Sequence, residues 1–281
     1  MELVTAWLEA LRCQLAERSL PVTEVRVGVF YTAARLASGH VGVAFTPRDL
    51  HDTVCCPRSA AAAPAAGRLA GQEAWALARD ALAPAPLRRA VGVAVLNALS
   101  ALAMEEYGVP GGEVIPDLDA LAAAGVQAGD RVALVGAFTP FIKALKGQVG
   151  ALWVIDKHPE ALKAEEQPLW RPPAQAPEVL AQADVALITG SALVEGGLEG
   201  LLDAARGART VVLAGPTASP WPPPFFARGV HILGGLRVRD GERLLQLVSE
   251  GGSGYFFDEA AQKVCMVRQD KAAGLLQRVR R

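Results

Sequence analysis

The chain has 281 residues, of which 51% are hydrophobic and 20% are charged. This is enough apolar material for one large or two ordinary domains, and too little charge for a disordered protein. The formal net charge is −1, with 28 Lys and Arg against 29 Asp and Glu. Because no basic excess exists to follow a phosphate backbone, a nucleic-acid partner is not expected.

Three features bear on the compartment. Charged residues interrupt the first 20 positions, so these do not resemble a signal peptide. The longest apolar run, residues 90–103, contains Asn97 and Ser100 and is shorter than the roughly 20 residues that a membrane-spanning helix needs. The four cysteines show no C-x-x-C spacing of the kind typical of structural zinc. We therefore expect a cytoplasmic protein with no membrane partner.

The first part of the chain predicts a mixture of helices and a hairpin. Apolar residues four apart indicate an amphipathic helix over residues 2–18. Alternating apolar residues predict two strands, 25–31 and 41–45, joined by a turn. Helical patterns follow over 72–83 and Pro86–Tyr107. The last helix is apolar on nearly every face, which predicts that it is buried between the two halves of the chain.

After Gly112 the pattern changes to alternating strands and helices. Runs of Val, Leu and Ile without alternation are typical of parallel strands that are covered on both faces. Such runs occur at residues 131–136, 151–156, 184–189 and 210–215. Residues 230–233 predict a short fifth strand, and residues 255–257 with 263–267 predict a closing hairpin. We predict an α/β fold in which a Rossmann-like, mostly parallel sheet with helices on both faces forms residues 111–281. A smaller α+β domain with a helical connector forms residues 1–110.

Ligands of such a sheet bind beyond the carboxyl ends of the strands, where the strand order reverses. The first strand ends at Gly136, and Phe138 stands where a dinucleotide fingerprint has its second glycine. Because the glycines that let the backbone approach a pyrophosphate are missing, NAD or FAD is not expected. The backbone N–H groups of this turn could still hold a carboxylate or a single phosphate. A purely structural turn is the alternative.

The next two strand ends carry acids and hydroxyls. Asp156 ends the second strand, where a Rossmann acid contacts a ribose hydroxyl, but it could also ligate a metal or cap the next segment. The third strand continues into Thr189, Gly190 and Ser191, with Glu195 one turn later. These residues suit donors for an anion together with an acid or metal ligand, and helix capping by a hydroxyl is the alternative.

The fourth strand ends in Gly215, Pro216 and Thr217, and the prolines after them favour a rigid loop at the strand end. Asn97 lies in the middle of the apolar helix. A buried amide needs polar partners, so it either contacts a ligand or links the two halves of the chain.

One cluster outside the strand ends has metal-ligand chemistry. His51, Cys55 and Cys56 carry soft and borderline ligand atoms. Adjacent cysteines rarely both reach one metal, and a buried free cysteine is often only a small hydrophobic residue. Both interpretations stay open.

Four segments resemble the DUF364 family, for which heavy-metal chelation is proposed. They are residues 184–195 (DVALITGSALVE), 212–220 (VLAGPTASP), 229–235 (GVHILGG) and 91–99 (VGVAVLNAL). The resemblance implies an N-terminal DUF4213 domain similar to the enolase N-terminal fold, followed by a Rossmann-like domain, with the site in the cleft between them. It implies a site drawn from Asn97, Gly136, Phe138, Asp156, Thr189, Gly190, Ser191, Gly215, Pro216 and Thr217. Where the family usually has Asn-Gly-Thr, this chain has Glu195–Gly196–Gly197, which adds a carboxylate.

Two functions of different classes follow. The first is binding of a transition or heavy metal, or of its chelate, with Asp156, Glu195, His51, Cys55 and Cys56 as metal ligands. The alternative is an enzyme, a transferase or lyase, that acts on a small anionic or nucleotide-like ligand in the same cleft. A binding module without catalysis is a third interpretation. The expected partner is a small molecule or metal, and a homodimer is left open.

Overall fold

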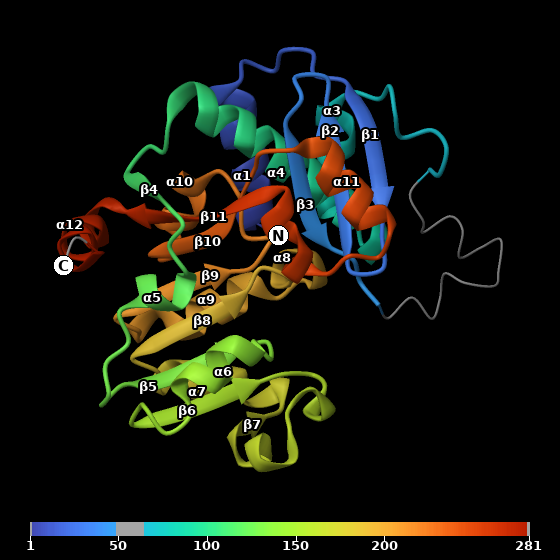
Figure 1. The fold of residues 1–281 in the computed structure, drawn as a ribbon. Helices are drawn as coiled ribbons and strands as arrows, with labels where there is room; N and C mark the ends of the chain where they lie inside the picture. Colours follow the sequence, from blue (N-terminus) through green and yellow to red (C-terminus); the bar gives the residue numbers. More distant parts are fainter. Residues whose placement is uncertain (1, 49–64, 280–281) are drawn as a thin grey trace.

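The computed structural model describes residues 2–48 and 65–279 and contains two β-sheets (Figure 1). A three-stranded antiparallel sheet has the order β1-β2-β3, and an eight-stranded sheet has the order β4-β11-β10-β9-β8-β5-β6-β7. Helices cover both faces of the larger sheet. The predicted α/β fold is therefore confirmed. The division into residues 1–110 and 111–281 stays a proposal.

Six parallel strands form most of the large sheet. The chain runs outward from β5 through β6 to β7, returns to the other side of β5 at β8, and continues to β9 and β10. This is the strand order of dinucleotide-binding folds, and it reverses between β5 and β8. The six strands are β5 (Arg131–Val135), β6 (Ala151–Ile155), β7 (Trp170–Arg171), β8 (Val185–Thr189), β9 (Thr210–Ala214) and β10 (Ile232–Val238).

The other edge of the sheet is antiparallel and differs from the prediction. β10 is longer than the predicted strand, and it pairs with β11 (Ala261–Arg268), which in turn pairs with β4 (Gly112–Pro116). Residues 255–257 lie in a 3-10 helix, η6 (Gly254–Glu259), so the predicted hairpin with 263–267 is wrong. Gly234 and Gly235 interrupt the apolar pattern of β10 because their neighbours leave no room for a side chain: Ala120, at the start of a helix, lies against Gly234, and the loop residues Ala218 and Ser219 lie against Gly235.

Helices cover the large sheet in two groups. One face packs against α1 (Glu2–Gln14), α4 (Pro86–Tyr107), α7 (Ala176–Gln182), α9 (Leu198–Ala204) and α10 (Pro222–Ala227). The other face packs against α5 (Ala120–Ala124), α6 (Thr139–Leu145) and α12 (Gln269–Val279). Other short helices are α3 (Ala74–Ala78), with η1 (Arg79–Leu82) after it, and α8 (Ala192–Glu195). Short 3-10 helices are η2 (Pro159–Ala161), η3 (Ala164–Leu169), η4 (Pro173–Gln175) and η5 (Ala205–Gly207).

The small sheet consists of β1 (Val22–Val27), β2 (Tyr31–Leu36) and β3 (Val41–Phe45). The prediction of one continuous strand over 25–31 is wrong, because the chain turns at Gly28, whose N–H donates to the carbonyl of Tyr31 at 2.9 Å. A Cβ at Gly28 would lie 2.1 Å from the carbonyl oxygen of Val248, so only glycine fits there. β2 escaped prediction because its centre, Thr-Ala-Ala-Arg, does not alternate.

The small sheet lies between two helices that come from distant parts of the sequence. α4 packs against β2 and β3, and α11 (Gly241–Ser249) packs against β1 and β2 (Figure 1). On the α11 side, Val41 and Val43 belong to one buried cluster with Leu244 and Val248. The C-terminal half of the chain thus supplies one of the two covers of the N-terminal sheet.

α4 is the central helix, and 13 of its 22 residues are buried. Among the described residues it is the one helix that is long and apolar enough to cross a membrane by length and composition. Of its most apolar stretch, 72% is buried inside the protein. That burial is what the core helix of a folded protein shows, and α4 has the bounds that the sequence predicts.

Candidate functional site

The loops after β5 and β8 meet at the point where the strand order reverses. Gly136 has φ +100°, a conformation that side chains disfavour, and a Cβ there would lie 3.1 Å from the Cβ of Thr189. Phe138, in the same turn, stacks on Phe141 of α6, with 5.0 Å between ring centroids and 20° between planes. The glycine therefore lets the two strand ends come together, while the aromatic ring packs beside the turn.

Asp156 joins the end of β6 to the turn after β5. One of its carboxylate oxygens accepts the N–H of Ala137 at 2.8 Å, and the other accepts the N–H of His158 at 2.9 Å. The protein's own carboxylate thus binds an amide of the turn that we expected to hold an anion. Each oxygen keeps further acceptor capacity, because an ionised carboxylate has about four lone-pair sites.

A short chain of hydrogen bonds leads from β8 to α8. The N–H of Ser191 donates to the hydroxyl of Thr189 at 3.2 Å, and the two hydroxyl oxygens are also 3.2 Å apart. The Ser191 hydroxyl donates to the Glu195 carboxylate at 3.5 Å. The Ser191 side chain forms no capping hydrogen bond with α8, whereas the hydroxyl of its neighbour Thr189 binds the N–H of Ser191, the residue that begins this turn. Both the capping alternative and the ligand-binding role therefore stay predictions.

Two cations flank Glu195, and sequence reasoning missed both. The ammonium group of Lys157 lies 3.1 Å from a Glu195 oxygen. The second cation is the guanidinium of Arg89, near the start of α4. Burial lowers the pKa of Arg89, and the electrostatic attraction of the Glu195 carboxylate partly offsets this lowering. Its buried Nε has no hydrogen-bond partner among the residues that the structure describes. Lys157 directly follows the predicted site residue Asp156 in the sequence, and this position was the signal by which it could have been predicted as a site residue.

Asn97 and Thr217 lie further along α4 and link three elements. The Asn97 amide nitrogen donates to the carbonyl of Val43 at 2.7 Å and to the carbonyl of Thr217 at 3.0 Å. The Thr217 hydroxyl accepts the N–H of Phe45 at 2.9 Å. Asn97 is 1% exposed, and its Oδ1 is buried without a partner in the described part of the chain. Of the two predicted roles, linking the halves of the chain is therefore the one with visible contacts.

The other residues of the β9 loop contact β10 and the segment at Gly254. The N–H of Gly215 donates to the carbonyl of Gly234 at 2.9 Å, which holds the loop against β10. Pro216 and Tyr31 both pack closely against Gly254. Burial raises the pKa of Tyr31 to about 12.

The structure thus brings the predicted residues together in two groups. The switch-point group lies at the ends of β5, β6 and β8 and contains Gly136, Phe138, Asp156, Thr189, Gly190, Ser191 and Glu195. The α4 group contains Asn97, Gly215, Pro216 and Thr217. The groups adjoin at Gly190, which packs closely against Thr217 and Ala218.

The predicted soft metal ligands His51, Cys55 and Cys56 lie outside the described residues. Within residues 2–48 and 65–279, no group of three or more His, Cys, Asp or Glu side chains is arranged to hold a metal ion. Asp156 and Glu195 could therefore supply only part of a coordination sphere.

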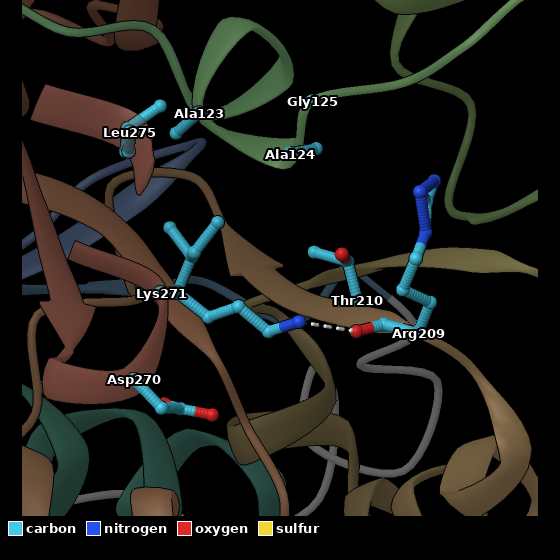
Figure 2. Close-up of a pocket in the computed structure, with 9 residues that line it drawn as sticks. Ala123, Ala124, Gly125, Arg209, Thr210, Asp270, Lys271 and Leu275 are labelled. Atoms are coloured by element: carbon cyan, nitrogen blue, oxygen red, sulfur yellow. Dashed lines mark hydrogen bonds between the residues drawn. The ribbon is translucent and has the colours of Figure 1, made fainter. Parts of the chain in front are cut away.

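A small pocket of about 180 Å³ lies at the opposite end of the sheet, between α5 and α12 (Figure 2). It is lined by Thr210 and Ile232, which begin β9 and β10, whereas ligands of such sheets bind at the carboxyl ends of strands. Its cations are already engaged. Lys271 donates to the carbonyl of Arg209 (Figure 2). The Arg209 side chain pairs with Asp130. We therefore place the functional site elsewhere.

His231, beside that pocket, predicts a pH dependence of stability. Its Nδ1 accepts the N–H of Val211 at 3.0 Å, and burial with nearby Arg268 and Lys271 lowers its pKa from 6.5 to about 4. Between these values the unfolded chain binds more protons than the folded one. We expect stability that is present above pH 6.5 to be lost as the pH falls to 4.

Urea unfolding of the wild type and His231→Gln, measured from pH 4 to pH 7, tests this. The glutamine oxygen can still accept the Val211 N–H but does not titrate. The free energy of unfolding of the wild type should fall more steeply with acid than that of the variant. Equal slopes would show that His231 is not buried in neutral form.

Comparison with known families agrees with the fold. The DUF364 family model, described as "Putative heavy-metal chelation", matches residues 119–267. The chain belongs to the DUF364 family. The DUF4213 model, with the same description, matches residues 9–100.

Individual relatives of this DUF364 protein are distant. An uncharacterized protein of Methanocaldococcus jannaschii is 25% identical over 183 residues, which span 64% of this chain and 66% of that protein. Two solved DUF364 proteins of unknown function have the same fold. The one from Pyrococcus horikoshii has a TM-score of 0.73 at 18% identity and covers 94% of this chain and 100% of its own. The one from Desulfitobacterium hafniense has a TM-score of 0.71 at 21% identity, with 94% and 98% covered.

Proposed function

We propose that the switch-point group binds a metal chelate, meaning a heavy or transition metal already held by a small anionic organic ligand. The observation that carries this proposal is the mixture of charges at one sheet edge. Two carboxylates, Asp156 and Glu195, lie among two cations, Lys157 and Arg89, and the hydroxyl of Ser191. The family description as heavy-metal chelation supports the same class of ligand.

Each part of such a ligand has a counterpart in the site. The carboxylates of a chelator pair with ammonium and guanidinium groups and accept hydrogen bonds from hydroxyls. A metal that keeps an open coordination position could take the Asp156 carboxylate, whose oxygens keep acceptor capacity beyond their bonds to two N–H groups. Soft metals on their own prefer thiolate and imidazole ligands, and the described residues contain no three-ligand group of this kind. A metal that brings its own ligands needs fewer from the protein.

Charge variants distinguish a chelate from a bare metal, because the two ligands respond with opposite sign. Lys157→Gln removes the cation that pairs with Glu195 at 3.1 Å. Binding of Ni(II)–citrate should weaken by about tenfold, which corresponds to about 1.4 kcal/mol. Binding of aquo Ni²⁺ at the freed carboxylates would instead strengthen. Isothermal titration calorimetry of untagged wild type and variant with Ni(II)–citrate, citrate and NiCl₂ measures the affinity for each of the three ligands.

Glu195→Gln is the complementary variant and should weaken aquo Ni²⁺ while leaving the chelate bound at least as tightly. Lys146→Gln is the matched control, because Lys146 is an exposed lysine at the far end of α6. A wild type that binds NiCl₂ as tightly as Ni(II)–citrate, with Lys157→Gln increasing both affinities, would contradict the chelate and favour a bare-metal site.

An enzyme acting on a small anionic or nucleotide-like ligand is the second candidate. It is favoured by the Ser191 hydroxyl, which donates to the Glu195 carboxylate, since a hydroxyl beside a carboxylate can act as an activated nucleophile. Incubation with adenine nucleotides or S-adenosylmethionine, followed by mass spectrometry, tests this function. Turnover that Ser191→Ala abolishes would support catalysis, and the absence of turnover with each of these compounds would count against it.

A further inference from the structure

A second cavity, of about 620 Å³, lies between the two halves of the chain, at the C-terminal end of α4 and away from the switch point. Its walls come from the turn between β2 and β3, the last turns of α4, the end of β10, and the strands β11 and β4. Its size falls in the range of roughly 300–1,000 Å³ that small-molecule sites occupy. We call it the α4 groove.

The floor of the α4 groove is apolar. Val114 of β4 pairs with Met266 of β11, and Val264 lies two residues before Met266 on β11. Directly paired residues of antiparallel strands lie on one face of a sheet, so these three side chains form a continuous surface. Met104 of α4 lies opposite them and adds a second flexible thioether. Methionines fill irregular spaces and adapt to ligands of different shape.

The rim of the α4 groove carries two free cations. Val264 pairs with Gly235, and Arg237 follows two residues later on the same face of β10, with Arg239 two residues beyond it. Both arginines are exposed, and neither guanidinium forms an ion pair or hydrogen bond with another residue in the described ranges. Most arginines of the described chain are paired with an acid, so these two are unusual in facing a cavity without a partner.

The single carboxylate at the rim does not neutralise the arginines. Glu105 accepts from, or pairs with, the imidazole of His40 at 3.2 Å. The other ring nitrogen of His40 lies 3.1 Å from the hydroxyl of Ser38. His40 and Glu105 therefore engage each other on one side, while Arg237 and Arg239 leave positive charge on the other.

The α4 groove is separate from the switch point. Arg89 and Glu105 are 16 residues apart on α4, which places them about 24 Å apart along the helix axis at 1.5 Å per residue. Between them the Asn97 contacts to Val43 and Thr217 close the space between the helix and its neighbours. A ligand in one site would not touch the other.

We propose that the α4 groove binds a small amphipathic organic anion, with its apolar body on the Val114, Val264 and Met266 floor and its acidic group at Arg237 and Arg239. Val264 and Met266 are already 4% and 0% exposed, so the favourable free energy comes from the apolar body of the ligand when it leaves water on this floor. A fully polar ion such as inorganic phosphate has no such body and is therefore not the preferred ligand. The two guanidinium groups select an acid over a neutral compound of the same shape.

Titration of the full chain with 8-anilinonaphthalene-1-sulfonate, an amphipathic anion whose fluorescence rises in apolar surroundings, tests the proposal. We expect saturable binding that octanoate displaces and that octanol or inorganic phosphate at the same concentration does not. The double variant Arg237→Gln/Arg239→Gln should weaken binding by about tenfold or more. Ala101→Phe, which fills the groove from α4, should abolish it.

Two controls locate the probe. Arg79→Gln removes an exposed arginine outside the groove and should have no effect. Tyr255→Ser/Phe256→Ser removes the exposed aromatic side chains of η6, which are 76% and 53% exposed, and should also have no effect. Fluorescence that depends on η6 and not on the arginines or Ala101 would overturn the proposal. If Ala101→Phe melts early, the double arginine variant decides alone, since both side chains are exposed.

Discussion

Ser100→Ala is expected to lower the free energy of unfolding by about 3 kcal/mol, although it removes a single oxygen atom. The Ser100 hydroxyl is fully buried and accepts the indole N–H of Trp7 at 2.9 Å and the backbone N–H of Trp221 at 2.8 Å. It donates to the carbonyl of Leu96 at 2.7 Å. Alanine would leave two buried donors, from α1 and from the loop after β9, without an acceptor.

Urea unfolding followed by circular dichroism measures this effect. Ser249→Ala is the matched control, because the Ser249 hydroxyl also donates to a carbonyl four residues earlier, Leu245, at 2.9 Å. Ser249 is exposed, so its replacement should change stability by less than about 0.5 kcal/mol. Equal effects of the two variants would show that the tryptophan contacts contribute little.

Asn97→Asp is expected to destabilise the protein by about 3 kcal/mol or more at pH 8, because a carboxylate would face the carbonyls of Val43 and Thr217 at the distances where Asn97 donates. A protonated aspartic acid can donate to one of these carbonyls, so folding would raise its pKa. The variant's stability should therefore be greatest below the unfolded pKa of about 4 and decline as the pH rises through the folded value.

Unfolding of Asn97→Asp and Asn97→Leu at pH 5 and pH 8 tests this. The leucine variant has a similar volume and cannot ionise, so it should be destabilised by about 2 kcal/mol at both pH values. A pH-independent loss in Asn97→Asp equal to that in Asn97→Leu would mean that water reaches the site and solvates the carboxylate.

Much of the large sheet could be predicted from sequence because its strands are covered on both faces. Continuous apolar runs identified β5, β6, β8 and β9 to within one residue at either end. β4 was missed because only Ile115 of its five residues is buried, so it lacks an apolar run. The length of β10 was missed because Gly234 and Gly235 are required by the close approach of α5 and of the loop after β9, which strand propensity does not reveal.

The candidate site was predictable where topology decides it. The rule that ligands lie at the reversal of strand order led to Gly136, Asp156 and Ser191 without any structure. Arg89 could not be found in this way, because its neighbour Glu195 is 106 residues away and only folding brings them together. Asn97 is the single asparagine in the chain. Its position within an apolar helix was enough to predict it as a site residue, but its partners, such as the carbonyl of Val43, could be identified only from the structure.

The covering of the small sheet by α11 has a consequence for how this chain is made. β3 is complete at Phe45, but the side chains that shield Val41 and Val43 belong to Leu244, Val248 and Phe257. During synthesis the N-terminal sheet must therefore wait, with one apolar face open, for some 200 further residues to emerge. At the usual 5–20 residues per second this is a delay on the order of ten seconds or more. A fragment that stops at residue 110 would keep that face exposed.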